Sequence, residues 1–186
     1  MGVLIRVAVV IATIFAGLAI AARSVEGQGV STPGLTAAFI FSFVKFTTWP
    51  AGALRDGNAI VICVIGNEQI ADALVQITYG KTVEGHPLGI RRTELDRPMT
   101  ECHVVFGASL NRNTAQELIR ATAGYPILTV SDFEDFAVIG GVANFFIDGG
   151  RMRFKVNPDA AERHRLRISS NLLTLARVVR DAPTAR

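Results

Sequence analysis

The 186-residue sequence has few charged residues and only two cysteines. Asp, Glu, Lys and Arg make up 19% of it against 49% hydrophobic residues, a balance that favours a packed core over disorder. The formal net charge of +3 comes without a dense run of Lys or Arg that could follow a phosphate backbone. We therefore expect a single folded domain, and nucleic acid is not an expected partner.

Recognisable catalytic motifs are also lacking. Gly80-Lys81-Thr82 has the end of a phosphate-binding loop, but Val75 stands where that motif needs glycine. The tripeptide also follows a predicted helix instead of opening one, so backbone N–H groups would not converge on a phosphate. No Gly-x-Ser-x-Gly sequence surrounds a serine. The sequence thus favours a non-catalytic protein, with an enzyme of unrecognised site as the weakest alternative.

Histidines and carboxylates form no recognisable metal or acid/base site. The three His residues are far apart in the sequence: His86, His103 and His164. Asp132, Glu134 and Asp135 form a small acidic cluster, which we interpret as a solvated turn or helix cap rather than as paired catalytic carboxylates. We therefore predict no metal and no cofactor.

The first 21 residues have the order of a secretory signal peptide. Arg6 precedes an uncharged apolar stretch, and Ala19-Ile20-Ala21 is a small-x-small cleavage pattern. The apolar stretch is short for the ~20 residues that span a bilayer, so an uncleaved anchor is the alternative. We predict a signal peptide over residues 1–21, cleavage after Ala21 and export.

The rest of the chain alternates between strand and helix patterns. Residues 22–34 are expected to be flexible, residues 35–180 to form one domain, and residues 181–186 to form a tail. The apolar periodicity predicts strands over residues 59–65, 88–92, 103–106, 127–130, 142–147 and 152–156, and helices over residues 35–48, 68–78, 114–123, 158–163 and 168–179. This pattern predicts an α/β three-layer sandwich with a mixed sheet of about six strands flanked by helices.

The two cysteines are predicted to form a disulfide. Cys63 lies inside one predicted strand and Cys102 at the start of another. Neighbouring strands lie about 4.8 Å apart, within the Cα separations that a disulfide tolerates. An exported protein meets oxidising conditions, which favour the bond over two reduced, buried thiols, the alternative.

One predicted strand carries a basic face. Arg151, Arg153 and Lys155 alternate along it and so point to the same side. Three more arginines follow: Arg163, Arg165 and Arg167. Together they predict a basic patch for an anionic ligand or an acidic partner surface, with an ordinary solvated face as the alternative.

Six segments in order resemble the YfiR-like family of periplasmic proteins. They are AAFIFSFVKFTTWP at 37–50, AIVICVIG at 59–66, GKTVEGHPLGIRR at 80–92, CHVVF at 102–106, PILTVSD at 126–132 and the block from 140 to 177. The resemblance implies a compact, often dimeric α/β fold and a non-catalytic regulator in the periplasm. Its best-known members bind the periplasmic domain of an inner-membrane diguanylate cyclase and hold the enzyme inactive, which limits cyclic-di-GMP and biofilm formation.

The resemblance leaves the partner open. In the best-known members an outer-membrane lipoprotein can draw the regulator away from the cyclase. Other members serve sensor kinases or other receptors. The alternative function is therefore a periplasmic small-molecule-binding sensor protein that feeds such a receptor.

The resemblance also implies candidate site residues. A small-ligand pocket would involve positions close to Trp49, Lys155, Arg167 and Ser169. Family members with redox behaviour carry a second cysteine pair near what are here Ala137 and Asn144, and this chain lacks that pair.

The aromatic helix predicted over residues 35–48 gains a second interpretation from the family. It is apolar on more than one side, which predicts contact with both the core and another protein chain. Phe39, Phe41 and Lys45 are the candidates for a homodimer or partner interface, with a purely structural role in the core as the alternative.

Overall fold

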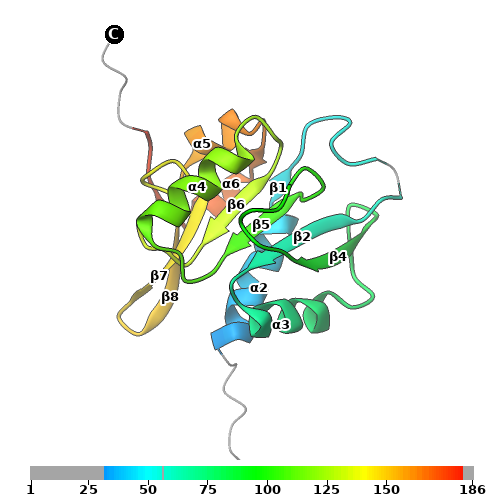
Figure 1. The fold of residues 1–186 in the computed structure, drawn as a ribbon, viewed down its shortest axis with the longest axis horizontal. Helices are drawn as coiled ribbons and strands as arrows, with labels where there is room; N and C mark the ends of the chain where they lie inside the picture. The colour runs from blue at the N-terminus through cyan, green and yellow to red at the C-terminus, as the bar shows by residue number, and fades with distance from the viewer. Residues whose placement is uncertain (1–31, 56, 182–186) are drawn as a thin grey trace, which may run out of the picture. The chain divides into compact units, whose positions relative to one another are not determined.

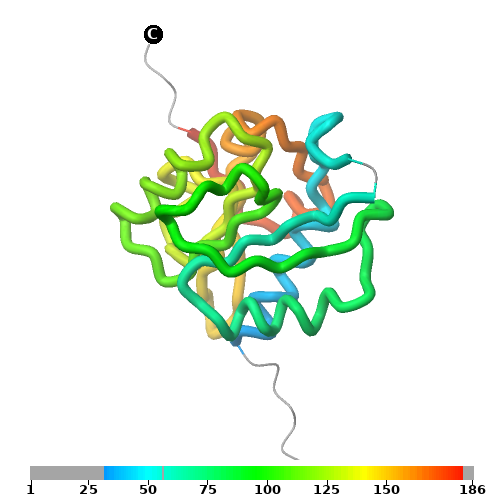
Figure 2. The backbone as a smooth tube through the Cα atoms, turned by 45° about the vertical axis from the view of Figure 1, so that its right-hand side comes forward, coloured from blue at the N-terminus to red at the C-terminus, as the bar shows by residue number. Residues whose placement is uncertain are grey.

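The computed structural model describes residues 32–55 and 57–181 (Figure 1; Figure 2). The predicted signal peptide and most of the flexible segment lie outside these residues. The helices are α2 (Thr32–Lys45), α3 (Glu68–Thr78), α4 (Arg112–Thr122), α5 (Pro158–Arg163) and α6 (Ser170–Leu173). Within the described part of the chain, no helix is both long and apolar enough to cross a membrane.

One large mixed sheet organises the fold. Its strands are β2 (Ile60–Ile65), β3 (Thr82–Val83), β4 (His86–Arg92), β5 (Val104–Gly107), β6 (Leu128–Ser131), β7 (Ala143–Asp148), β8 (Arg151–Val156) and β10 (Arg177–Val178). Their spatial order is β10-β8-β7-β6-β5-β2-β4-β3, and β4, β2, β5, β6 and β7 run parallel. A separate antiparallel pair joins β1 (Thr47–Thr48) to β9 (Arg167–Ile168). The predicted α/β class and mixed sheet are confirmed, although the sheet has eight strands because β3 and β10 add two short edges.

Helices cover both faces of this sheet, as predicted (Figure 1). Alternate side chains of β2, such as Ile60, Ile62 and Val64, pack in one apolar cluster with α2 and α3. The intervening Cys63 and Ile65 pack in a second cluster with α4 on the other face. Because side chains alternate along a strand, the continuous apolar run of β2 fills both clusters.

Aromatic rings join α2 to the β7–β8 hairpin. The ring centroid of Phe43 lies 5.2 Å from that of Phe154 and 5.8 Å from that of Phe145, both edge-to-face. The hairpin turns at Gly149 and Gly150, which have φ angles of 56° and 72°. Two consecutive positive φ angles match the tight turn that Asp-Gly-Gly predicts, since glycine adopts them without steric cost.

The predicted helix over residues 168–179 is wrong. Only Ser170–Leu173 is helical, and Arg177 and Val178 form β10 beside Lys155 and Val156 of β8. The apolar spacing that suggested a helix does not describe one buried face, because Leu172 is buried while Leu175 is 74% exposed. Because Arg177 and Val178 pair with the edge of β8, the chain is extended there and not helical. Helix α4 begins two residues before the predicted 114, and the Asn111 side chain caps it by accepting the N–H groups of Asn113 and Thr114.

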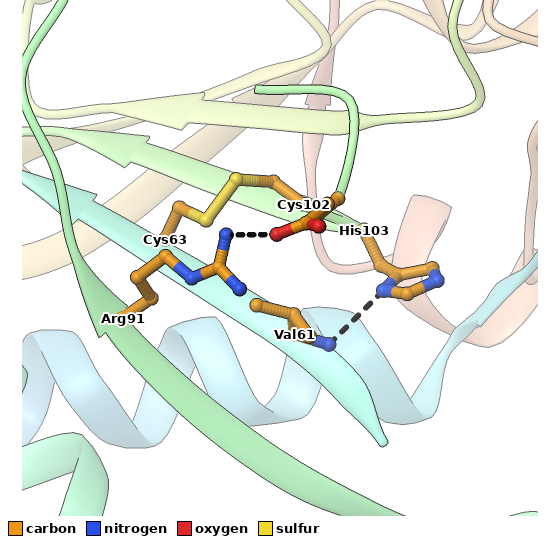
Figure 3. The surroundings of a disulfide bond; sticks show 6 residues. Val61, Cys63, Arg91, Cys102 and His103 are labelled. Carbon is orange, nitrogen blue, oxygen red and sulfur yellow. Dashed lines mark hydrogen bonds and ion pairs between the residues drawn. A yellow bond between two sulfur atoms is a disulfide. The ribbon is translucent and has the colours of Figure 1, made fainter. Parts of the chain in front are cut away.

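The structure contains the predicted disulfide between Cys63 and Cys102 (Figure 3). It ties β2 to the residues that lead into β5, and both cysteines are buried in the α4-side cluster. An ion pair between Arg91 and Glu101, 2.6 Å from nitrogen to oxygen, lies beside it at the surface. The bond thus links two neighbouring parallel strands at the centre of the sheet.

Two histidines are held neutral inside the fold. Nδ1 of His103 accepts the Val61 N–H at 3.0 Å, and Nε2 lies 3.3 Å from the Ala53 carbonyl oxygen (Figure 3). Nδ1 of buried His164 lies 2.8 Å from the Tyr125 carbonyl oxygen. Burial lowers the pKa of both imidazoles. Their hydrogen bonds to backbone carbonyl oxygens raise the pKa, but by less than burial lowers it.

These lowered pKa values predict a loss of stability in mild acid. The unfolded chain, in which histidine has a pKa of about 6.5, binds more protons than the native state between that value and the lowered native ones. The free energy of unfolding should therefore be constant above about pH 7 and fall as the pH drops below about 6.5. Urea denaturation between pH 8 and pH 5.5 measures it, and a His103→Gln/His164→Gln variant should show a flatter profile. Stability that rises on acidification over this range would contradict the assignment.

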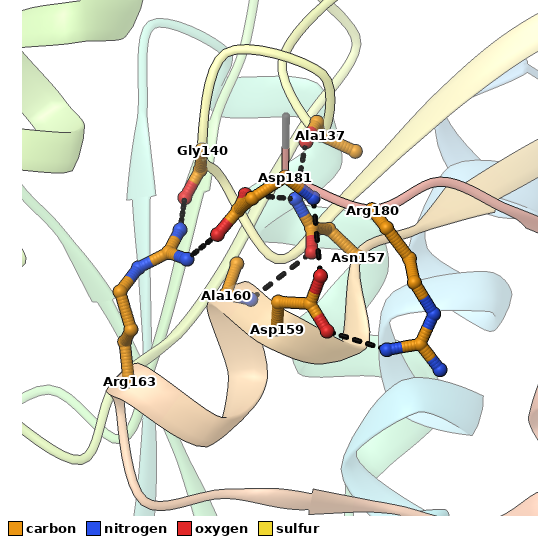
Figure 4. A network of polar contacts seen from close by, with 8 residues as sticks. All are labelled: Ala137, Gly140, Asn157, Asp159, Ala160, Arg163, Arg180 and Asp181. Carbon is orange, nitrogen blue, oxygen red and sulfur yellow. Dashed lines mark hydrogen bonds and ion pairs between the residues drawn. The ribbon is translucent and has the colours of Figure 1, made fainter. Parts of the chain in front are cut away.

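The end of the described chain is fixed by a polar network (Figure 4). Nδ2 of buried Asn157 donates to the Ala137 carbonyl oxygen and to Asp181, both at 2.9 Å. Its Oδ1 accepts the Ala160 N–H and so caps α5. Arg163 pairs with Asp181, and Arg180 pairs with Asp159. The residues after β10 are therefore anchored to α5.

Candidate functional site

A cleft of about 500 Å³ brings together two of the predicted ligand-binding residues. Trp49 follows β1 and Arg167 begins β9, and these two strands pair with Thr48 opposite Arg167. The loop after α5 supplies Arg165, which has a positive φ of 58°, and α5 itself supplies Glu162. Trp49 and Arg167 are 118 positions apart in the sequence. They line one cleft because β1 and β9 pair with each other.

The charges of this cleft favour an anion. Arg165 donates to the Gly124 carbonyl oxygen at 3.2 Å, while the guanidinium of Arg167 is exposed and forms no ion pair among the described residues. Glu162 is the only acidic lining residue against two arginines. Trp49 is 92% buried, and its indole nitrogen has no hydrogen-bond partner in the described structure. The cleft therefore combines an aromatic wall with an excess of positive charge.

The other two predicted pocket residues lie elsewhere. The Ser169 hydroxyl accepts the Asn171 N–H at 3.2 Å and caps α6. The Lys155 ammonium donates to the Glu134 carbonyl oxygen at 3.1 Å and sits over the Phe146 ring at 5.4 Å. Neither residue lines the cleft of Trp49 and Arg167. Ser169 borders it in sequence, whereas Lys155 belongs to a different surface.

The predicted basic patch is divided in the structure. Arg151, Arg153 and Lys155 lie on the face of β8 that points away from the α2–α3 cluster, whereas Phe154 and Val156 point into that cluster. Arg163 instead pairs with Asp181, and Arg165 and Arg167 line the cleft described above.

Arg177 completes the face of β8. Its Cα lies opposite that of Lys155, and its guanidinium sits 5.4 Å from the Phe146 centroid. Arg153 is held by Asp148, with 3.1 Å between Nε and Oδ2, but half of its side chain stays exposed. We call Arg151, Arg153, Lys155, Arg177 and Phe146 the basic β8 face. Arg177 is absent from the predicted basic patch because the apolar spacing of residues 168–179 predicts a helix there.

The candidate interface residues on α2 differ in their surroundings. Phe39 is partly buried within the same chain, with its ring centroid 5.7 Å from that of Phe145. Phe41 is partly buried, and the ammonium groups of Lys45 and Lys81 lie 5.7 and 5.1 Å from its ring centroid. Phe39 therefore has a role in the core, while Phe41 and Lys45 contribute to the outer side of α2.

Ala137 and Asn144, near which family members with redox behaviour carry a second cysteine pair, are neighbours in this structure. The Ala137 N–H donates to Oδ1 of Asn144 at 3.2 Å, and both residues are fully buried. In this chain a hydrogen bond, not a disulfide, therefore joins these two positions.

No group of three or more His, Cys, Asp or Glu residues in the described ranges could hold a metal ion. The described residues form an α/β fold with a mixed sheet between helices, and this fold carries both the cleft and the basic β8 face. The chain belongs to the YfiR/HmsC-like family (DUF4154), whose model matches residues 34–177. This family consists of periplasmic regulatory proteins, non-catalytic in character, that act on membrane signalling proteins.

Two solved structures of low sequence identity resemble this chain, and the first of them shows the same fold. A conserved domain protein from Vibrio cholerae O1 biovar El Tor is 12% identical with a TM-score of 0.55, and the match covers 80% of this chain and 60% of that one. An ABC domain from Streptococcus pneumoniae, solved with L-Trp, is 10% identical with a TM-score of 0.46, over 64% of this chain and 54% of that one. The chain thus spans little more than half the length of each.

Proposed function

We propose that this protein binds the periplasmic sensor domain of an inner-membrane diguanylate cyclase and restrains the enzyme, and so limits cyclic-di-GMP synthesis and biofilm formation. The observation that carries the proposal is the basic β8 face, together with membership of a family of such regulators. Arg151 and Arg177 on this face are exposed, whereas Lys155 is buried and donates to the Glu134 carbonyl oxygen. An outer-membrane lipoprotein that competes for the regulator would release the cyclase.

The chemistry of this face fits an acidic partner surface. Two cations, Lys155 and Arg177, lie over the Phe146 ring, and Arg151 and Arg153 continue the same strand face. Two carboxylates, Asp148 and Glu134, offset only part of this charge. Arginine and aromatic side chains are enriched in protein interfaces, where exposed charges steer the encounter and fix the orientation. The complex should therefore weaken as salt is added.

The outer side of α2 is the proposed dimer surface. Phe41 and Lys45 are accessible there, and Phe39 supports them from the core. A homodimer formed through α2 would leave the basic β8 face free, because Phe39 and Phe43 of α2 pack under the opposite side of the β7–β8 hairpin.

Charge reversal on the basic β8 face should weaken the partner complex. The partner is first recovered by pull-down from solubilised inner membrane with residues 22–186. We expect Arg151→Glu/Arg153→Glu to bind its periplasmic domain at least about tenfold more weakly, since like charges across an interface repel. Arg97→Glu/Arg120→Glu makes the same charge change at two exposed sites outside this face and should bind within about twofold of the wild type. Equal affinity of the two variants would refute the assigned face, and recovery of no cyclase would refute the assigned partner.

A second candidate function is a periplasmic sensor of a small anionic ligand that reports to a sensor kinase or other receptor. The cleft of Trp49 and Arg167 favours it, because an exposed guanidinium without an ion pair stands beside a buried aromatic wall. The two candidates differ in what binds first, a protein domain or a metabolite.

A further inference from the structure

A second cavity, of about 480 Å³, lies at the carboxyl ends of the central strands. Asn67 follows β2 and Asp132 follows β6, and β5 lies between these strands in the sheet. After β2 the chain enters α3 on one face, and after β5 it enters α4 on the other face. Crevices of this kind, where successive helices leave on opposite faces, are the usual ligand sites of open α/β sheets.

The wall of this cavity is apolar and contains one free hydroxyl. Ile70 and Phe145 are buried there, and Met152 is partly buried beside them. Thr36 of α2 also lines the cavity and is 96% buried, yet its hydroxyl forms no hydrogen bond with any described residue. Because Thr36 lines the cavity, this hydroxyl is available to a ligand there.

The charged groups at this cavity are both acidic. Asp132 and Glu134 are its only charged lining residues. Glu134 has a cation near it, because the Lys155 ammonium lies 3.8 Å from its carboxylate. Asp132 accepts the Ser109 N–H at 2.7 Å and has no cation partner among the described residues. Partial burial raises the pKa of this carboxyl, and the hydrogen bond from the Ser109 N–H opposes the shift.

The first turn of α3 does not reverse this negative character. The Asn67 side chain already accepts the Ile70 N–H at 3.0 Å, so that donor is not available to an anion. An anionic ligand would therefore meet Asp132 with little to offset the repulsion.

We propose that this cavity binds a small organic cation, a protonated amine on an apolar body. The ammonium group pairs with the Asp132 carboxylate, and the body lies against Ile70, Phe145 and Met152. The Thr36 hydroxyl takes a polar group of the ligand. This site is separate from the cleft of Trp49 and Arg167, because no residue lines both cavities, and it meets the basic β8 face at Phe146.

Three probes of similar shape test the charge requirement. Isothermal titration of residues 22–186 is done with 2-phenylethylamine, 2-phenylethanol and 3-phenylpropanoate. We expect the amine to bind with a Kd of about 1 mM, an ordinary value for a ligand of this size, and the alcohol and the carboxylate to bind at least about tenfold more weakly. Amine binding should also weaken as salt is added.

Matched variants locate the site. Asp132→Asn keeps an oxygen for the Ser109 N–H and removes the charge, so the fold is retained while amine affinity falls at least about tenfold. Glu117→Gln removes an exposed carboxylate of α4, and Arg167→Ala alters the other cleft, and both should leave amine affinity unchanged. The proposal is overturned if the amine does not bind, if the alcohol binds as tightly, or if Arg167→Ala abolishes binding while Asp132→Asn does not.

Discussion

Replacing Cys63 and Cys102 together with alanine should lower the free energy of unfolding by about 4 kcal/mol. The bond closes a loop with a sequence separation of 39 residues, and chain-entropy accounting for a loop of that size gives this value. Both cysteines are buried in the α4-side cluster, so the folded state has little freedom to relax after the change. Urea denaturation of the variant against the oxidised wild type measures the difference.

Reduction of the wild-type protein provides the control. If the effect comes from the crosslink, the reduced wild type and the double alanine variant should lose similar stability, and reductant should not affect the variant. A loss under about 1 kcal/mol would contradict the argument that the bond restrains the unfolded chain. Because the chain lacks the second cysteine pair, all of the response to reductant should come from this bond.

Local sequence signals account for the central part of the fold. The run from residue 59 to residue 65 is long enough for one strand, and Gly66 ends it. The Asn67 side chain caps α3, and both the strand end and this cap depend on neighbouring residues alone. The disulfide follows from two strands that pack side by side, and β2 and β5 do pair.

The structure of residues 168–179 depends on a contact with a strand that is distant in sequence, and the periodicity of apolar residues does not show such a contact. Residues 168–179 have apolar spacing typical of a helix, yet β10 forms because β8 offers a free edge and Val179 donates to the Val156 carbonyl oxygen at 2.9 Å. Because residues 168–179 are predicted to be helical, Arg177 is not predicted to lie on the basic β8 face. The position of Arg177 can be derived only after the order of strands is known.

The candidate sites show the same limit. The family resemblance suggested Trp49 and Arg167 together, but nothing in the local sequence places them in one cleft. The acidic cluster at Asp132 is interpreted from sequence as a solvated turn or helix cap, and in the structure Asp132 and Glu134 are exposed in a bend and turn. The sequence does not show that Asp132 also accepts the Ser109 N–H and lines a cavity. Thr36 carries no local signal at all, since its hydroxyl matters only because α2 crosses the end of the sheet.

Phe43→Ala should cost about 3–5 kcal/mol of stability, the usual range for truncating a buried phenylalanine. Phe43 is fully buried and is the ring of α2 that meets both Phe145 and Phe154 edge-to-face. Its loss opens a cavity between α2 and the β7–β8 hairpin and removes two aromatic pairs. Chemical denaturation measures the loss.

Phe41→Ala is the matched control for this prediction, because it removes the same atoms two residues away on the same helix. Phe41 is only partly buried, with two lysines over its ring, so its truncation should cost less than half as much. Equal losses would show that the stability of α2 does not depend on which side of the helix faces the sheet. A smaller loss for Phe43→Ala than for Phe41→Ala would contradict the packing of α2. In that case the outer surface of the helix would be a larger source of stability than the core, which fits only a chain whose α2 is covered by another molecule.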